Sequence, residues 1–278
     1  MEDIRKLQMV ELSILKEFIR ICENHNLRYF AIGGTVLGAV RHNGFIPWDD
    51  DVDVSMPRED YDKFQELIAS GVTDNTYEVE TMYTHENHIA PAMKFVDTSV
   101  TMVFTRAKIE YKTNAFIDIF PLDGLPSNKI IRFFHVRRFL IQLYLFLFST
   151  FDTSVRQDNK NRSLPVRLAM WACNTFNVQK FFNKRKIVRR GDKILTKYSF
   201  GKTSFCSPQL WGHYKTRAIF PTEWLGAGTT LQFEDIEINA PEHYPKYLQQ
   251  LYGANYMELP PENKRETHAS SVIFHEGN

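Results

Sequence analysis

The segment Trp48–Met56 reads WDDDVDVSM and combines a run of acidic residues with a strict alternation. The alternation over Asp51–Val54 predicts a strand in which Asp51 and Asp53 point to one face and the valines to the other. Two such carboxylates are costly because like charges repel and aspartate disfavours strand interiors. A hard divalent cation offsets that cost, and Mg²⁺ prefers carboxylate and phosphate oxygens. A solvated acidic loop is the alternative, but it leaves the alternation unexplained.

A further aspartate interrupts an apolar strand pattern at Phe116–Phe120, which reads FIDIF. Burying an unpaired carboxylate there would be strongly unfavourable, and a nearby cation is the simplest compensation. Pairing of Asp118 with an arginine or lysine, or a place on an edge strand, is the alternative. Together with Asp51 and Asp53, the pattern predicts Asp118 as a third ligand of one or two metal ions that face a phosphate chain.

Two glycines, Gly33 and Gly34, stand between a predicted strand and a helical pattern that begins at Thr35. Glycines let backbone N–H groups approach a phosphate, and a helix N-terminus favours its negative charge. Any tight turn can use a glycine pair, so this signal is weak alone. Arg41 follows near the end of the helical pattern and has the chemistry for bidentate phosphate binding, although a surface role fits it equally well.

The order of the predicted elements favours an α+β fold with a mixed sheet, flanking helices, and a helical and irregular C-terminal extension. Strands without regularly interposed helices argue against a doubly wound fold. We expect a catalytic core over residues 1–128 and a C-terminal part over residues 129–278 that completes the donor and acceptor site. The expected helices are 3–25, 35–42, 58–69, much of 130–200 and 244–251, and the expected strands are 27–32, 51–56, 77–83, 92–96, 100–104, 115–120 and 231–238.

The composition describes a folded globular protein without a strong charge bias. The 278 residues include 34 Lys plus Arg and 33 Asp plus Glu, so the net charge of +1 gives no argument for a nucleic-acid partner. Cys22, Cys173 and Cys206 are far apart, which argues against a disulfide framework and a structural zinc site. The charged N-terminus does not resemble a secretory signal. We therefore expect a cytoplasmic protein with reduced thiols.

Three stretches of this chain resemble the LicD family, which is related to the fukutin-type transferases of the nucleotidyltransferase superfamily. The stretches are GGTVLGAVRHNGFIPWDDDVDVSMPREDYDKF (Gly33–Phe64), FIDIFPLDGLP (Phe116–Pro126) and LQFEDIEINAPEHYPKYLQQLYGANYMELPPENKRETH (Leu231–His268). Residues 129–224 match only loosely. The resemblance implies a nucleotidyltransferase-like fold.

The resemblance also implies an activity. It is the Mg²⁺-dependent transfer of a phospho-alcohol, most often phosphocholine, from a CDP-linked donor to a hydroxyl of a cell-surface glycan. Acceptors of this kind are teichoic acid, lipopolysaccharide and capsule precursors, including lipid-linked oligosaccharides, and Mn²⁺ is an alternative metal. The residues implied are Asp51, Asp53 and Asp118 as catalytic metal ligands, Gly33, Gly34, Thr35, Arg41 and Lys94 at the donor phosphates, Trp48 and Asp49 as loop-orienting or donor-contacting residues, and Arg265 and His268 without a derived role.

Two other functions remain open on the residues alone. A nucleotidyltransferase that passes the nucleotide itself to a small molecule or protein would have a similar site, because only the phosphorus attacked differs. An inactive binding or scaffold protein of the same fold is the third reading, and the retained Asp51, Asp53 and Asp118 argue against it.

The segment Ile130–Phe151 contains the basic residues Arg137 and Arg138, followed by an apolar run. That apolar run is too short to span a bilayer by itself. Residues 180–197 carry many Lys and Arg among apolar residues. A helix of this kind can lie in a membrane interface, which would suit an acceptor that is linked to a lipid. Peripheral contact with the inner face of the cell membrane is therefore one expectation, and a buried helix beside an ordinary basic surface is the other.

Overall fold

The computed structural model describes residues 2–85, 88, 91–106, 109–150, 171, 175, 181–208, 210–212, 214–262, 265 and 271–274. These residues form an eight-stranded sheet with the central order β1–β2–β5–β4–β10, while β3 also pairs with β4, β6 with β5, and β7 with β6. The strands are β1 Phe30–Ala31, β2 Asp53–Pro57, β3 Tyr77–Glu80, β4 Met93–Arg106, β5 Ile109–Leu125, β6 Phe205–Ser207, β7 Phe220–Pro221 and β10 Ser271–Phe274.

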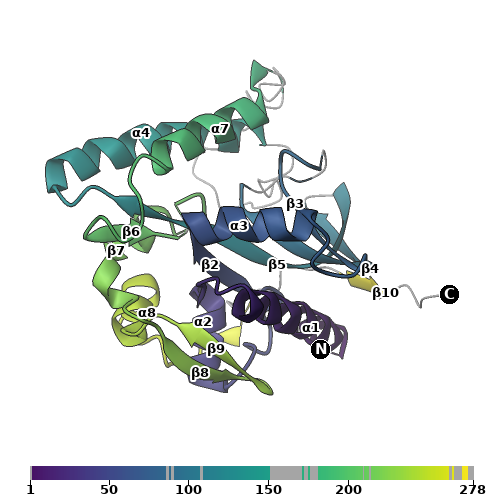
Figure 1. The fold of residues 1–278 in the computed structure, drawn as a ribbon. Helices are drawn as coiled ribbons and strands as arrows, with labels where there is room; N and C mark the ends of the chain where they lie inside the picture. Colours follow the sequence, from purple (N-terminus) through teal and green to yellow (C-terminus); the bar gives the residue numbers. More distant parts are fainter. Residues whose placement is uncertain are drawn as a thin grey trace.

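The sheet is mixed, as the sequence predicts. Strands β2 and β5 are parallel, whereas β1, β3, β4 and β10 join through antiparallel pairs. Figure 1 shows the helices packed around this sheet without regular alternation along the chain. The α+β nucleotidyltransferase-like architecture is therefore confirmed.

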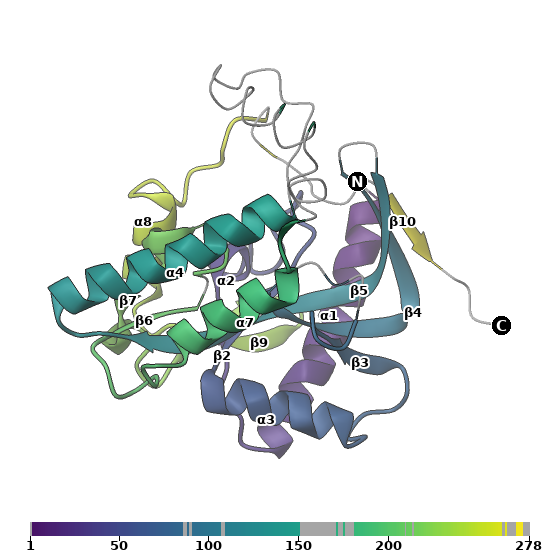
Figure 2. The same cartoon turned by 90° about the horizontal axis from the view of Figure 1, so that it is seen from above.

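Two pairs of helices lie at opposite ends of the molecule, and two further helices pack on the sheet. The helices are α1 Glu2–Asn24, α2 Gly33–His42, α3 Arg58–Ala69, α4 Lys129–Ser149, α7 Lys184–Leu195 and α8 Tyr244–Tyr252. Helices α4 and α7 run side by side at the top of Figure 1, and Figure 2 shows the same pairing from above. Helices α2 and α8 lie at the bottom of Figure 1 with a hairpin made of β8 Thr229–Phe233 and β9 Ile236–Ala240.

The core forms where the apolar stripe of α1 meets the sheet and α3. Phe18 of α1 is fully buried and contacts Phe64 of α3 and Tyr29 beside β1, with ring centroids 5.1 and 5.2 Å apart. Phe233 and Tyr247, from the C-terminal part of the chain, belong to the same buried cluster. The division of the chain at residue 128 stays a prediction, although β6 and β10 join the sheet of the N-terminal part.

Several predicted strand boundaries were wrong, each for a local reason. The segments 92–96 and 100–104 form one strand, β4, with a register shift between Asp97 and Thr101. Strand β5 continues through Pro121 to Leu125, although the predicted strand ended at residue 120. The pairing of β5 with β4 ends at Ile119, so β4 does not lie beside Pro121. Proline has no N–H to donate, and it is tolerated where a strand lacks a neighbour on one side.

The C-terminal strand prediction over 231–238 was also wrong, because the chain reverses in its middle. Glu234 adopts a φ of 55° between β8 and β9, and its carboxylate accepts bonds from Arg5 and from the backbone N–H of Phe45. The region 27–32 pairs with β2 only at Phe30–Ala31. The predicted helices at 58–69 and 244–251 are confirmed.

The region 130–200 contains α4 and α7, as expected, while most of residues 151–183 lies outside the described residues. Helix α4 buries Val136, Phe139, Leu143 and Phe146 on one side. Among the helices that the structure describes, none has the length and apolarity that crossing a membrane requires.

Candidate functional site

A line of polar side chains crosses the centre of the sheet. Asp53 of β2 is paired with Asp118 of β5, and Asp118 is paired with Lys94 of β4. Directly paired residues on neighbouring strands point to the same face of a sheet. The structure therefore brings Asp53, Asp118 and Lys94 together on one face, in that order, as the sequence pattern required for the two aspartates.

The aspartates that precede β2 are placed differently from the prediction. Strand β2 begins at Asp53, so Asp51 lies in the connecting segment and not within the strand. Asp50, which directly precedes Asp51, is only 2% exposed. The backbone N–H of Asp53 donates to Oγ1 of Thr35 at 2.8 Å. Thr35 thus holds the start of β2 in place.

The two glycines have distinct roles at the start of α2. Gly33 is the first residue of α2, with a φ of 57°, and its N–H donates to the hydroxyl of Tyr247 at 2.9 Å. A Cβ at Gly34 would lie 2.7 Å from Oδ2 of Asp49. Gly34 therefore allows the Asp49 carboxylate to approach the first turn of α2.

Arg41 lies at the other end of the ten-residue helix α2, about 12 Å along the axis from Gly33. Its guanidinium donates to the carbonyl oxygens of Tyr256 and Glu258 at 3.1 and 3.2 Å. Burial lowers the pKa of Arg41, while the negative charge of Asp49 acts in the opposite direction. Arg41 thus ties α2 to the C-terminal segment.

That segment also reaches the acidic loop. The guanidinium of Arg265 lies over the ring of Trp48, 4.7 Å from its centroid, and Nε of Arg265 donates to the carbonyl of Pro260. Trp48 and Arg265, which the resemblance selects from opposite ends of the chain, are therefore neighbours. His268 lies outside the described residues.

Three side chains near the aspartates, two of them buried and one half-buried, were not predicted from the sequence. The hydroxyl of Tyr214 donates to that of Tyr252 at 2.6 Å, and burial raises the pKa of both phenols. The charges of Asp53, Asp51 and Asp49 act on Tyr214, which places it near the acidic segment. No sequence pattern marked these tyrosines. Glu11, in contrast, interrupts the apolar stripe of α1 and could have been found there.

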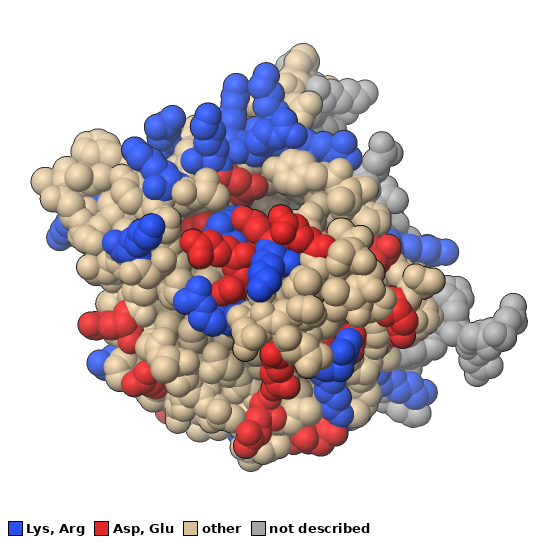
Figure 3. All heavy atoms as spheres, in the orientation of Figure 1, with Lys and Arg blue, Asp and Glu red and all other residues tan. Residues whose placement is uncertain are grey.

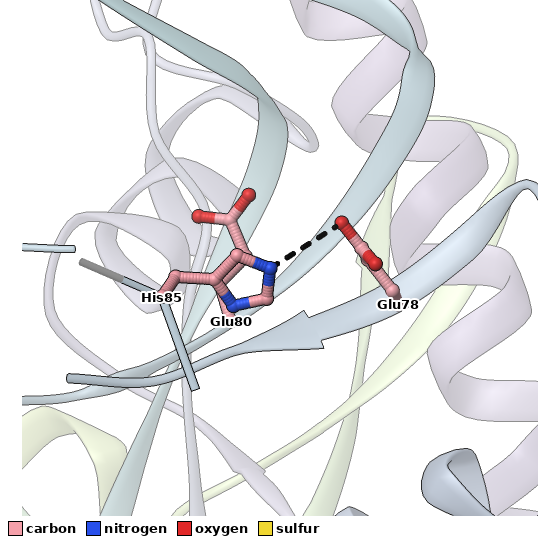
Figure 4. Close-up of side chains that lie close together, drawn as sticks. All are labelled: Glu78, Glu80 and His85. Carbon is pink, nitrogen blue, oxygen red and sulfur yellow. Dashed lines mark ion pairs between the residues drawn. The ribbon is translucent and has the colours of Figure 1, made fainter. Parts of the chain in front are cut away.

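Glu78, Glu80 and His85 form a group of two carboxylates and an imidazole (Figure 4). One ligand atom from each of Glu78, Glu80 and His85 lies within 4.8 Å of the others, close enough to share a cation. Glu80 is paired with Lys94 across β3 and β4, and the contact with His88 is the largest cause that lowers its pKa. The side chains of Glu78 and His85 are 45% and 38% exposed. Because water can satisfy them, we assign no ion to this group.

Comparison with known proteins shows which protein family this chain is similar to. Residues 26–132 match the model described as LicD/FKTN/FKRP, nucleotidyltransferase domain. Over 272 residues the chain is 29% identical to the lipopolysaccharide cholinephosphotransferase LicD of Haemophilus influenzae, which covers 95% of each protein.

Shorter similarities fall on other relatives. A segment of 49 residues is 41% identical to the human ribitol 5-phosphate transferase FKRP, covering 18% of this chain and 10% of that protein. Another of 55 residues is 40% identical to an uncharacterised protein of Rickettsia typhi, covering 20% of this chain and 18% of that protein. The residues that form β1, β2 and β5, including the paired Asp53 and Asp118, thus lie in the segment that is similar to the nucleotidyltransferase domain of the LicD family.

Proposed function

We propose that this protein transfers a phospho-alcohol from a CDP-linked donor to a hydroxyl of a cell-surface glycan. Transfer of a phospho-alcohol is favoured by the LicD cholinephosphotransferase of Haemophilus influenzae and by ribitol 5-phosphate transferase FKRP. Phosphocholine is our first candidate, because the cholinephosphotransferase is similar along nearly the whole chain, whereas the similarity to FKRP is confined to a short segment.

The observation that carries this proposal is the pairing of Asp53 with Asp118, beside Lys94, on one face of the sheet. Two carboxylates in register, with Asp51 just before the strand, form a donor set that suits Mg²⁺ or Mn²⁺. The fully buried Glu11, both of whose oxygens lack a hydrogen-bond partner among the described residues, is a further carboxyl group close enough to feel the charges of Asp51 and Asp118. A divalent cation bound here would neutralise charge on the donor phosphates.

The chain's own side chains then have definable tasks. Lys94, held over the ring of Phe116 with Nζ 3.1 Å from the centroid, offers a positive charge to a phosphate at the edge of the aspartate pair. Gly34 sets the position of Asp49, and Arg41 and Arg265 flank the loop that carries Trp48. Holding the donor in line with the acceptor hydroxyl is mainly a positioning effect.

The proposed reaction is a single displacement at phosphorus. The acceptor hydroxyl oxygen forms a bond to the phosphorus that carries the alcohol, and the bond from that phosphorus to the bridging oxygen breaks. CMP leaves with the bridging oxygen, and the hydroxyl proton passes to one of the site carboxylates. The nucleotidyltransferase alternative uses the same side chains but attacks the phosphorus that carries cytidine. An inactive binding protein would show neither product.

We further propose that helices α4 and α7 contact the cytoplasmic surface of an anionic membrane. Ile130, Phe134 and Ile141 of α4 are 69%, 65% and 58% exposed. Figure 3 shows Lys and Arg side chains gathered along the upper edge of the molecule, where α7 lies in Figure 1. The basic residues of α7 are Lys184, Arg185, Lys186, Arg189, Arg190 and Lys193. Exposed apolar side chains beside basic ones suit an interface of anionic lipid.

The proposal is tested by incubating the protein with Mg²⁺, a glycan acceptor and a panel of CDP-alcohols, and by following release of CMP. We expect one CDP-alcohol to react at least about tenfold faster than the others, because a site built for one alcohol rejects those that leave its polar groups unpaired. The Asp118→Asn variant is the matched control for contaminating hydrolases. Equal CMP release by the wild type and this variant would contradict the proposed site.

A further inference from the structure

Glu11 lies in the middle of the apolar stripe of α1, outside the matched domain at residues 26–132. Leu7, Ile14 and Leu15 fall on the same side of the helix, one turn before and after it. Its exposed fraction is 0%, the same as for these apolar neighbours. Acidic side chains are almost never fully buried unless something compensates their charge.

No protein group that the structure describes provides that compensation by hydrogen bonding. Both carboxylate oxygens of Glu11 are buried, and neither has a hydrogen-bond partner among the described residues. An ionised carboxylate in this state carries its full desolvation penalty. A protonated carboxyl group would be little better off, because its O–H would need an acceptor and none is hydrogen-bonded to it among these residues.

The position of Glu11 shows where the compensating group lies. One turn earlier on the same face, the side-chain amide of Gln8 donates to the carbonyl oxygens of Ile46 and Asp49, at 3.2 and 2.8 Å. This face of α1 therefore lies against the segment that leads into the acidic run. After burial, the largest influences on the pKa of Glu11 are the negative charges of Asp51, Asp50, Asp49 and Asp118, and all of them raise it.

We propose that Glu11 is a further carboxylate of the metal site and binds its divalent cation, either directly or through one water. The inference deepens the proposed function, since it rests on a cation at Asp51, Asp53 and Asp118. A cation beside these groups would offset the repulsion among the carboxylates. It would also give the buried oxygens of Glu11 the partner that they lack among the described residues. Helix α1 then contributes a side chain to a site whose other ligands come from β2, β5 and the segment before β2.

Metal binding without any donor tests the role of Glu11. Titration calorimetry of the wild type with Mn²⁺ and Mg²⁺ gives the affinity and stoichiometry, and the Glu11→Gln variant is titrated in parallel. We expect its affinity to be roughly 10- to 100-fold weaker, as for other groups that support metal ligands. The exposed Glu23, near the end of the same helix, supplies the matched control Glu23→Gln, which should bind like the wild type.

Thermal unfolding gives a second readout with a distinctive sign. Without metal, Glu11→Gln should unfold at a higher temperature than the wild type, because it removes a buried carboxyl group whose ionisation is opposed by burial and by the neighbouring aspartates. With metal, its gain in Tm should be smaller than that of the wild type. If Glu11→Gln does not fold, Glu11→Asp keeps the charge on a shorter side chain and should bind metal more weakly than the wild type.

The outcomes separate this inference from the proposed function. Unchanged metal affinity in every folded Glu11 variant would overturn the inference, even if the wild type transfers a phospho-alcohol. Weaker metal binding in Glu11→Gln would support it, even if the wild type proved to transfer a nucleotide instead.

Discussion

Asp53 and Asp118 lie directly opposite each other on β2 and β5, the parallel pair at the centre of the sheet. Each belongs to a strand whose neighbouring residues, Val54 and Ile117, are fully buried. The carboxylates are thus fixed by the register of the strands and not by a flexible loop. Sheet packing alone would favour apolar residues at these two positions, so the acidic pair needs a reason outside packing.

Replacement of either paired aspartate by asparagine should remove activity while the fold is kept. We expect Asp53→Asn and Asp118→Asn each to lower kcat/KM by roughly 100- to 10,000-fold, since losing one ligand weakens charge stabilisation at the phosphate. Initial rates of CMP release measure this effect, and circular dichroism checks the fold. The exposed Asp235→Asn is the control, since it lies in the β8–β9 turn. Near-normal activity of Asp53→Asn would refute the metal assignment.

Substitution of Gly34 by alanine should act through Asp49. The added Cβ would lie 2.7 Å from Oδ2 of Asp49, so the carboxylate must move away from the first turn of α2. We expect Gly34→Ala to lower kcat/KM by at least about tenfold while the protein stays folded. A double-mutant cycle with Asp49→Ala gives the check. If Gly34→Ala lowers activity as much in the Asp49→Ala background as in the wild type, its effect does not pass through Asp49.

Stability should depend on pH through Asp192 of α7. Burial raises the pKa of this carboxyl from 3.8 to about 6, while Tyr83 and Trp211 donate to it at 3.4 Å. The folded protein therefore keeps the proton to higher pH than the unfolded chain does. Its contribution to stability is fully present below pH of about 4 and is lost as pH rises through about 6.

Asp192→Asn should consequently be more stable than the wild type at pH 7, by up to about 3 kcal/mol, with the difference vanishing near pH 4. Urea unfolding at both pH values measures the free energy of unfolding. A wild type that is more stable than Asp192→Asn at pH 7 would show that the ionised carboxylate is stabilised by Arg58, the largest favourable charge acting on it.

Binding to lipid vesicles should depend on the basic residues beside the exposed side of α4. The variant with Arg137→Glu and Arg138→Glu should co-sediment less with vesicles that contain anionic lipid, because each basic residue near such a surface contributes about 1 kcal/mol. The variant with Lys63→Glu and Lys246→Glu changes the charge equally at exposed positions on α3 and α8 and should bind like the wild type. Absence of vesicle binding by the wild type at low salt would favour an α4 covered by protein.

Much of this fold could be predicted from local sequence patterns, because those patterns directly determine its helices and the phase of its strands. The helix Arg58–Ala69 has the bounds that its periodicity and the preceding Pro57 indicate. The joining of two predicted strands into β4 could not be foreseen, since a register shift depends on the partner strand. The turn at Glu234 is likewise fixed by distant groups, Arg5 and Phe45.

The candidate site shows the same division. The alternation of aspartate and valine over Asp51–Val54 predicted that Asp53 lies on the polar face of its strand. Asp118 could be singled out because it is the one charged residue in an apolar strand pattern. The contact between Trp48 and Arg265 joins distant segments, and only the resemblance selected both residues. Tyr214 and Tyr252 carried no signal, because aromatic residues are common in this chain and usually pack in the core. Glu11 was visible as a break in the apolar stripe, and only its burial gives that break a meaning.

The phosphorus that is attacked is the central claim, and a doubly labelled donor tests it most directly. The CDP-alcohol found by CMP release carries one isotope in the alcohol and another in the cytidine, and is incubated with the protein, Mg²⁺ and a glycan acceptor. The account predicts that the alcohol label enters the glycan and the cytidine label is released as CMP, in equal amounts. Cytidine label in the glycan or in another acceptor would show transfer of the nucleotide and would contradict the account.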